Sequence, residues 1–442
     1  MASTYLTRAA TGSVTSDKIF TMSVWLKRST VTGSGSADHW FMHENASSHT
    51  QKLDLHFTDD EFRMGWWDGS SEYNLDSKMK FRDTNAWYHI VFRCDTTQAT
   101  ASNRVRVYVN GEQIELQQIG GGSPDAQQPA QNATMDLGTK IICIGRYQAS
   151  SPSQYFNGCM SHMHYCDGQS YAPTEFGETD STTGEWKIKP DPSLTYGNNG
   201  FWLFKNDNAV TNRAAGTSSG NFTVAGGTFT KTEDNPSNVF ATINPLVPYS
   251  SNYDFHNGNT TVENDGSSAA WTTRWGVSTL GMSSGKFYAE AKIANIGTNQ
   301  MYALGLIKDV GTFAPSSSVG ANGLLYYSTG NIYNGISGQD QTGLASYTTN
   351  DIIGLAIDAT NGSAQWYKNG SAIGNAETIA TDGTWFFVTN FYTNGKVDMN
   401  YGNGYFGTTA VASAGTNASG IGIFEYNVPT GYTALSTKGL NL

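Results

Sequence analysis

Charged residues are scarce in this chain. They make up 14% of the 442 residues, against about 25% in an average soluble domain. The basic residues are scattered along the sequence and form no patch, which argues against nucleic-acid binding through phosphate neutralisation. The net charge of −11 is instead typical of a protein that keeps a large exposed surface in solution.

Long apolar runs and helical periodicity are also missing. No run of about 18 apolar residues is present, so we expect no membrane insertion. No long segment repeats apolar residues at helical spacing. The first residues, 1–8, have no signal-peptide core and already alternate like a strand, so we expect synthesis in a cytoplasm without a cleaved export signal.

Cysteine is rare, and its four copies all lie in the first half. Cys94 and Cys143 fall inside apolar strand-like segments, where a free thiol behaves as a small hydrophobic side chain. We therefore expect reduced, buried thiols, with a disulfide pair as the alternative, and extend this expectation to Cys159 and Cys166.

Aromatic and β-branched runs dominate what remains. Aromatic residues make up 12% of the chain, and 49 glycines together with Asn, Ser and Thr separate the apolar runs. This pattern predicts short strands joined by tight turns. Residues 19–27, for example, place Phe20, Met22, Val24 and Leu26 on one face. Many half-apolar strands are most simply buried in two packed antiparallel sheets, so the fold class is all-β.

One turn pattern occurs twice. Asn110-Gly111 follows a strand in the first half and Asn369-Gly370 follows one in the second, and Asn-Gly is the strongest short hairpin signal. In each half an apolar strand ending in aspartate, Asp95 or Asp358, lies upstream. The repeat predicts two related sandwiches rather than one large one.

The boundary between the halves is marked by composition. Residues 206–235 are rich in Asn, Thr, Gly, Ala and Ser and end in a cluster of turn-forming residues. We therefore predict domains at 1–207 and 236–442 joined by a polar linker at 208–235. The alternating Phe222, Val224 and Phe229 would also allow this segment to pack against one of the sandwiches.

The first half carries long motifs of a recognisable kind: TYLTR, FTMSVWLKRS, AWYHIVFRCDTTQATASNRVRVYVNGEQI and YFNGCMSHMHYCDGQSYAPTEFGETDSTTGEWKIK. Over about residues 1–207 they resemble the laminin-G-like, concanavalin A-type domain of marine bacteriophage structural proteins. The second half resembles a SPRY (B30.2-like) domain through GKFYAEAKI, YALGLIKD, DIIGLAIDATNGSAQWYKNG and VPTGYTAL. The resemblance implies two concanavalin-type antiparallel β-sandwich (jelly-roll) domains in a virion component.

Catalytic residues are not evident. Sandwiches of this type that hydrolyse glycosides use acidic residues at alternate positions, Glu-x-Asp-x-x-Glu. The nearest approach is Glu178-Thr179-Asp180, but Thr183 stands where the second glutamate is needed. We therefore predict that the protein is not an enzyme.

Metal ligands are only weakly indicated. His162, His164 and Cys166 alternate and would share one strand face, but no second ligand pair at metal spacing accompanies them. Asp59 and Asp60 supply hard oxygen ligands in a turn. We expect no cofactor, with calcium at Asp59 and Asp60 as the alternative and no firm metal site.

Paired aromatics are the best candidates for a binding surface. Trp66, Trp67 and Asp68 combine aromatic rings with a carboxylate, as sugar sites do, and Tyr326-Tyr327 is a second pair. Adjacent residues on a strand point to opposite faces, so one member of each pair can enter the core while the other stays outside. The outer ring would contact carbohydrate or a partner subunit.

These expectations combine into one function. We predict a non-enzymatic phage virion surface protein, as a capsid decoration, spike or tail-fibre element, with lectin-like domains that contact host surface glycans. Its partners would be other virion proteins and further copies of itself in a homo-oligomer, and it would reach the virion surface after synthesis in the host cytoplasm. The alternatives are a secreted bacterial carbohydrate-binding adhesin and a concanavalin-fold glycoside hydrolase.

Overall fold

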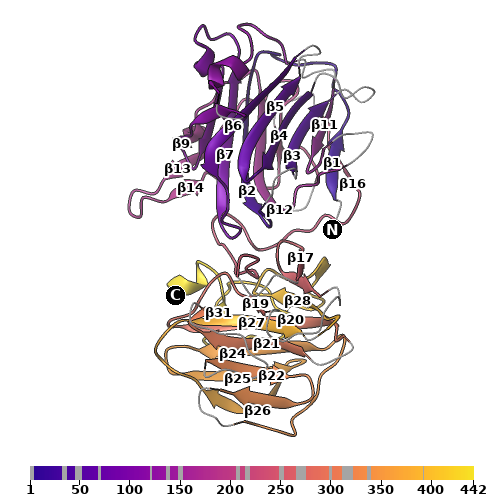
Figure 1. Cartoon of the computed structure of the whole chain (residues 1–442), viewed down its shortest axis with the longest axis vertical. Helices are drawn as coiled ribbons and strands as arrows, with labels where there is room; N and C mark the ends of the chain where they lie inside the picture. Colours follow the sequence, from indigo (N-terminus) through magenta and orange to yellow (C-terminus); the bar gives the residue numbers. More distant parts are fainter. Residues whose placement is uncertain are drawn as a thin grey trace. The chain divides into compact units, whose positions relative to one another are not determined.

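The computed structural model of this chain is built from strands and short 3-10 turns. Its two compact units span residues 1–231 and 232–442, and Figure 1 shows the strands of each. Among the described residues the only helices are short 3-10 turns. None of them is long and apolar enough to cross a membrane. The all-β prediction is confirmed. The described residues are 4–31, 37–44, 52–67, 71–119, 122–135, 140–147, 153–205, 210–214, 220–247, 253–264, 275–297, 301–310, 322–335, 340–391 and 393–442.

The first unit is a sandwich of two antiparallel sheets. The eight-stranded sheet has the order β10 (Leu116–Gln118), β6 (Glu72–Lys80), β5 (Glu61–Trp67), β4 (Lys52–Thr58), β3 (Ala37–Glu44), β11 (Ile141–Ile144), β1 (Tyr5–Arg8) and β16 (Thr223–Ala225). The six-stranded sheet has the order β15 (Phe201–Leu203), β12 (Gly158–Asp167), β2 (Ile19–Arg28), β7 (Trp87–Asp95), β8 (Val105–Val109) and β9 (Glu112–Gln113). A small hairpin, β13 (Gly177–Thr179) and β14 (Trp186–Ile188), and the 3-10 turns η1 (Ala101–Asn103), η2 (Pro124–Gln127) and η3 (Pro173–Glu175) complete it.

The second unit is also a two-sheet sandwich. Its larger sheet has the order β17 (Asp254–His256), β18 (Thr261–Glu263), β28 (Lys396–Asn400), β20 (Lys286–Asn295), β24 (Ile352–Asp358), β25 (Ser363–Lys368) and β26 (Ser371–Thr378), and β31 (Thr433–Ala434) pairs in parallel with β20. The five-stranded sheet has the order β19 (Trp275–Val277), β27 (Trp385–Phe391), β21 (Met301–Lys308), β22 (Gly323–Tyr327) and β23 (Asn331–Asn334). The hairpin β29 (Tyr405–Phe406) and β30 (Thr409–Ala410) and the turn η5 (Gly439–Asn441) lie outside these sheets.

Both predicted Asn-Gly hairpins are present. Asn110 and Gly111 have φ of 49° and 88°, and Asn369 and Gly370 have φ of 48° and 79°. Two consecutive positive φ values define the tight turn that matches the twist of paired strands. Each asparagine side chain also accepts a backbone N–H from the strand that pairs with the one before its turn: Asn110 from His89 of β7 at 2.9 Å and Asn369 from residue 352 of β24 at 2.8 Å.

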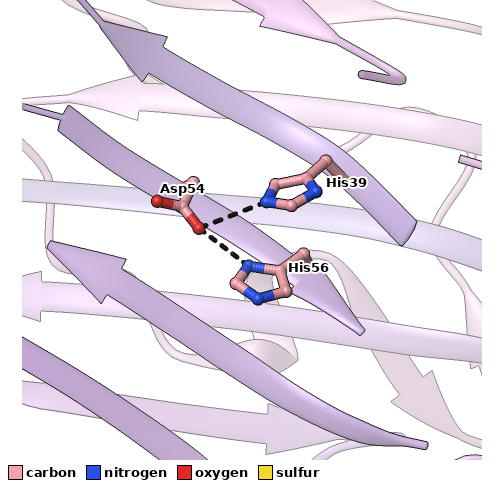
Figure 2. Close-up of side chains that lie close together, drawn as sticks. All are labelled: His39, Asp54 and His56. Carbon is pink, nitrogen blue, oxygen red and sulfur yellow. Dashed lines mark ion pairs between the residues drawn. The ribbon is translucent and has the colours of Figure 1, made fainter. Parts of the chain in front are cut away.

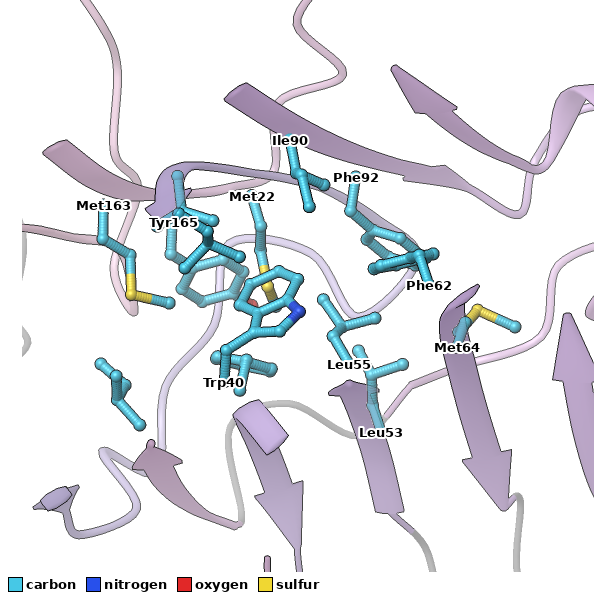
Figure 3. Packing of buried hydrophobic residues seen from close by; sticks show 14 of the residues in the cluster. Met22, Trp40, Leu53, Leu55, Phe62, Met64, Ile90, Phe92, Met163 and Tyr165 are labelled. Atoms are coloured by element: carbon cyan, nitrogen blue, oxygen red, sulfur yellow. The ribbon is translucent and has the colours of Figure 1, made fainter. Parts of the chain in front are cut away.

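The core of the first sandwich lies between its two sheets. Figure 3 shows Trp40, Leu55 and Phe62 from the eight-stranded sheet packed against Met22 and Phe92 from the six-stranded one. These side chains are almost fully buried. Removing such a side chain costs about 3–5 kcal/mol for an aromatic ring, because a cavity remains.

The central strands of the six-stranded sheet are buried on their outer face too. His89 on β7 stacks between the rings of Trp25 and Trp186, with centroids 4.8 and 5.9 Å away. Its Nδ1 accepts the Trp186 indole N–H at 2.9 Å, and its Nε2 contacts the Ser23 hydroxyl at 2.8 Å. The Trp186 ring also rests on Gly111, where an added Cβ would lie 2.7 Å from it. The segment after β12 therefore covers this face.

The second unit uses the same device. The ring of Tyr426 rests on the turn residue Gly370, where an added Cβ would lie 2.6 Å away. The buried Glu290 on β20 accepts the backbone N–H groups of residues 425 and 426, both at 2.9 Å. Desolvation by burial raises the pKa of Glu290 to about 7. The C-terminal segment is thus fastened to the outer face of the larger sheet.

The predicted linker needs a correction. The division between the units falls after Lys231, and β16, which lies inside the range predicted as linker, pairs with β1 through Leu6 and Val224. Phe222 is buried and meets the Phe201 ring edge-on at 5.0 Å. The segment joins the first sandwich because its alternating apolar residues extend the sheet and its core.

None of the four cysteines forms a disulfide. Cys94, Cys143 and Cys166 are buried, whereas Cys159 is half-buried. Desolvation by burial raises the pKa of Cys94 and of Cys166, and a thiol that stays protonated is a poor nucleophile.

We predict that the native protein exposes at most one reactive thiol, that of Cys159. Titration with a thiol reagent should find a single slow group in buffer and four groups in denaturant. The variant Cys159→Ser should remove the native reaction without changing the stability. A disulfide found by mass spectrometry, or rapid reaction at Cys94, would contradict this.

We also predict that acid destabilises the first unit through its buried histidines. Burial lowers the pKa of His89 to about 3 and that of His162 to about 4. The ordinary value is about 6.5, so between these values the unfolded chain binds more protons than the folded chain. Stability is therefore complete above about pH 6.5 and is lost as the pH falls. At pH 5 each such histidine costs about 2 kcal/mol relative to pH 7.

Thermal unfolding of the full chain at pH 7 and pH 5 tests this prediction. Burial raises the pKa of Asp38 to about 6, so this carboxyl group stabilises the folded chain as the pH falls. This effect opposes that of the histidines, but it comes from a single group. In His89→Gln the loss between the two pH values should shrink by about 2 kcal/mol. His256→Gln, which changes the second unit, is the control and should leave the first unit's loss intact. An equal loss in wild type and His89→Gln would refute the assignment.

Candidate functional site

The predicted tryptophan pair divides between the two faces of β5. Trp66 is buried and stacks on Tyr73 with centroids 4.8 Å apart, so its ring belongs to the core. Trp67 points to the outer face of the eight-stranded sheet and is half-buried. Its indole N–H is shielded from water and has no hydrogen-bond acceptor among the described residues. Asp68 lies outside the described residues.

The predicted tyrosine pair divides in the same way. Tyr326 has no exposed surface and donates its hydroxyl hydrogen to the carbonyl of Ala345. It therefore has no face open to a ligand, which corrects its choice as a surface residue. Tyr327 is half-buried on the other face, where its ring lies 4.9 Å from Tyr302 and 6.0 Å from Tyr333.

In the acidic turn proposed for calcium, the carboxylate of Asp60 pairs with two arginines. Asp60 is buried, and its two carboxylate oxygens lie 3.3 Å from Arg28 Nη1 and 3.1 Å from Arg82 Nε. Arg28 itself is fully buried and also lies 3.4 Å from Asp38. Asp60 thus neutralises a buried guanidinium, as a buried charge requires. Asp59 forms the adjoining turn with a positive φ of 50°.

The alternating His162, His164 and Cys166 do not converge. A bulge in β12 between Ser161 and His164 breaks the alternation at His162, which has a φ of 45°. The His164 ring packs on Trp202 at 5.1 Å, and its Nδ1 lies 2.8 Å from the Tyr196 hydroxyl. These residues cover the sheet and have structural partners.

The nearest approach to a glycosidase motif also has structural partners. Asp180 accepts the backbone N–H groups of Thr182 and Thr183 at 2.8 and 3.0 Å and pairs with Lys187 at 3.1 Å. The hydrogen bonds from the two threonines lower the pKa of Asp180 to about 2. Glu178 is exposed on β13. A carboxyl group with so low a pKa cannot act as a general acid at neutral pH.

A groove that the sequence did not indicate lies at the edge of the first sandwich. It forms where edge strand β10 of one sheet approaches the β8–β9 hairpin of the other, with η2 alongside. Its volume is about 530 Å³. The lining residues are Lys78, Ser102, Val105, Arg106, Gln113, Ile114, Glu115, Leu116, Gln117, Gly122, Pro124, Asp125 and Gln128. The run of amide and acidic residues at 112–118 was the signal available in the sequence.

Polar groups in the groove are held in place by neighbours. Lys78 and Glu115 form an ion pair at 2.8 Å across its rim. The Gln128 side chain accepts the backbone N–H of Val105 at 3.0 Å, which fixes the floor. The Arg106 guanidinium donates a hydrogen bond to the side-chain carbonyl oxygen of Asn103. The arrangement combines fixed hydrogen-bonding groups with apolar surface, as small-ligand sites do.

A second cluster missed from the sequence lies on the outer face of the eight-stranded sheet. Figure 2 shows His39 from β3 and His56 from β4 facing the carboxylate of Asp54. The Asp54 Oδ2 atom lies 2.7 Å from His56 Nδ1 and 3.5 Å from His39 Nε2. Within the described parts of the chain, this is the one group of three possible metal ligands whose atoms lie within 4.8 Å of one another. The spacing of Asp54 and His56 was visible in the sequence, but the strand that brings His39 beside them was not.

Residues 2–169 match the family described as the concanavalin A-like lectin/glucanases superfamily. This match covers the greater part of the first sandwich. Among curated proteins none matches the chain.

Several solved structures resemble about a third of this chain. The SPRY domain of human HERC1 is 19% identical, with 33% of this chain and 91% of that chain covered and a TM-score of 0.28. The SAP-like pentraxin of Limulus polyphemus is 14% identical, with 38% and 71% covered and a TM-score of 0.27. The Ruminococcus gnavus IT-sialidase CBM40 bound to α2,3-sialyllactose is 16% identical, with 33% and 73% covered and a TM-score of 0.26. At such identities and TM-scores, these likenesses carry no inference about function. The family match places residues 2–169 in a concanavalin-like lectin and glucanase fold.

Proposed function

We propose that this chain is a non-enzymatic surface protein of a phage virion, and that its first sandwich binds carbohydrate. The observation that carries the binding proposal is the groove of about 530 Å³ between the β8–β9 hairpin and β10. A groove of this size fits a short saccharide, since small-ligand sites run from about 300 to 1,000 Å³.

The chemistry of the groove suits sugar hydroxyls. Gln113 and Gln117 offer both amide donors and carbonyl acceptors, and Lys78 and Glu115 add one charge of each sign. Hydroxyl groups need donors and acceptors together, whereas a charged ligand would need one sign in excess. Ile114, Leu116 and Pro124 provide apolar surface for the C–H faces of a sugar ring.

Binding without hydrolysis is supported by the state of the acidic groups. The ion pair with Lys78 lowers the pKa of Glu115, so this carboxylate stays ionised at neutral pH. Asp180 is likewise held ionised by its turn. Hydrolysis of a glycoside needs a protonated acid beside a second carboxylate, and neither group fits the acid's role.

We also propose that Trp67 and Tyr327 contact a sugar or a partner subunit. Each ring is half-buried on the outer face of its sheet. A partly exposed aromatic ring can stack on a sugar or be covered by a partner subunit. We also propose calcium binding at Asp59. Asp60 is left out of this site because its carboxylate pairs with arginines.

The virion part of the proposal is supported by composition and by the sequence resemblance. A charged content of 14% leaves few charges to protect the edge strands of the two sandwiches. Such edges suit burial against other virion proteins and against further copies of this chain. Symmetry would multiply weak glycan contacts on the host surface into avidity. A secreted bacterial adhesin and a glycoside hydrolase are the alternative functions.

We predict that substitution in the groove weakens glycan binding. The double variant Gln113→Ala with Glu115→Ala should bind a glycan selected on an array at least about tenfold more weakly, because two side-chain hydrogen bonds are lost. Glu112→Ala is the matched control, since this exposed glutamate precedes Gln113 on β9 but does not line the groove. Calorimetry gives the affinities, and a reducing-end assay should detect no product.

Four results would refute these claims. Equal affinity of the double variant and wild type would place the site elsewhere, and loss in Trp67→Ala alone would place it on the outer sheet face. Absence of binding across a broad array would reject a glycan ligand. Steady release of reducing ends would show that the protein is a hydrolase.

We predict self-association of the full chain. Sedimentation velocity at increasing concentration should show a discrete oligomer, because edge strands with few charges favour pairing with other copies. A monomer at every concentration would contradict the homo-oligomer, and purified virions lacking the chain would contradict the virion location.

A further inference from the structure

We propose that His39, Asp54 and His56 bind one divalent transition-metal ion of the zinc type in the first sandwich. The site is separate from the groove, and it does not rest on the proposed function. Its three ligands come from neighbouring strands of the eight-stranded sheet, on the face directed away from the core (Figure 2).

The strand register brings the three side chains together. His39 on β3 is the direct partner of His56 on β4. Asp54 lies two residues before His56, so both point to the same face. On this strand Leu53, Leu55 and residue 57 point into the core, which leaves the alternate positions for the outer face. The cluster is therefore fixed by sheet pairing rather than by a loop.

The distances suit a shared ion. Both imidazoles face the same oxygen, with His56 Nδ1 at 2.7 Å and His39 Nε2 at 3.5 Å from Asp54 Oδ2. All three ligand atoms lie within 4.8 Å of one another. Zinc binds imidazole nitrogen and carboxylate oxygen at about 2.0–2.2 Å, which sets its ligand atoms roughly 3–3.6 Å apart. Small side-chain rotations would bring the three atoms to that spacing.

The surroundings hold the ligands in position. The His39 ring packs between His56, with centroids 4.2 Å apart, and Tyr147, at 4.6 Å. The Asp54 carboxylate rests on Gly65 of β5, where an added Cβ would lie 2.8 and 2.9 Å from its two oxygens. A side chain at position 65 would displace the carboxylate, so the glycine keeps the space that Asp54 occupies.

Burial explains why a cation would be favoured here. The exposed fractions of His39, Asp54 and His56 are 3%, 1% and 7%. A buried carboxylate is costly unless positive charge lies close to it. A metal ion held by two neutral imidazoles supplies that charge in the space where the three ligand atoms meet.

The ligand set selects the class of metal. Two imidazole nitrogens and one carboxylate suit zinc, cobalt, nickel or copper, whereas calcium and magnesium prefer oxygen ligands only. Three protein ligands also leave one position for water on a tetrahedral ion. The proposal therefore predicts zinc or cobalt binding and no calcium binding at these residues.

Cobalt titration of the full chain tests the proposal. After dialysis against a chelator, wild type should bind one Co²⁺ per chain, with the visible absorption of a low-coordinate site, and excess Zn²⁺ should displace it. At a hundredfold excess of Zn²⁺ over its Kd, the unfolding temperature of the first unit should rise by roughly 5–10 °C.

Variants assign the site to its residues. His56→Gln and Asp54→Asn should each weaken Co²⁺ binding at least tenfold, while circular dichroism verifies that the chain remains folded. His256→Gln is the matched control: this histidine also faces a carboxylate, that of Glu263 at 3.8 Å, but it lies in the second unit. The control should bind Co²⁺ like wild type.

The possible outcomes distinguish this proposal from the glycan one. No Co²⁺ binding by folded wild type, or unchanged binding in both His56→Gln and Asp54→Asn, would overturn the metal site. Loss of binding in His256→Gln alone would overturn it as well. If His56→Gln does not fold, His39→Gln is measured instead. Glycan affinity in the groove should be equal with and without Zn²⁺, so either proposal can fail while the other holds.

Discussion

Burial of both faces of a central sheet is the constraint on which each unit depends. Every residue of β24 is buried, and so are nine of the ten residues of β2. One face of such a strand packs against the opposite sheet, so the other face needs a cover of its own. An uncovered apolar face would expose hydrophobic surface to water at a cost of about 25 cal/mol per Å².

The two units meet this constraint in the same way. In the first, the segment after β12 places Trp186 over His89 and Gly111. In the second, the C-terminal segment places Tyr426 over Gly370 and is fastened by Glu290. The turn glycine has two roles: it adopts the positive φ of the hairpin, and it leaves space for the covering ring. The repeated Asn-Gly signal in the sequence therefore marks more than a turn.

The candidate sites of the first unit lie away from this covered face. The groove forms at the open edge between β8–β9 and β10, and the cluster of His39, Asp54 and His56 lies on the outer face of the other sheet. One sheet is used for stability, with neutral histidines in its covered face. The other sheet and the edge present charged, amide and imidazole groups. At these places a concanavalin-type sandwich can acquire a ligand without loss of its core.

The sequence by itself determined the strands, the two Asn-Gly hairpins and the division into two sandwiches, because these follow from alternation and turn chemistry over a few residues. It also predicted that each aromatic pair divides between two faces. Only the tertiary structure decided that Trp66 and Tyr326 are the inner members and that Asp60 neutralises Arg28. The same holds for β16, for the groove and for the meeting of His39 with His56. The physical reason is that a strand's alternation fixes two faces but not which one is covered, and that the register between strands depends on contacts distant in the chain.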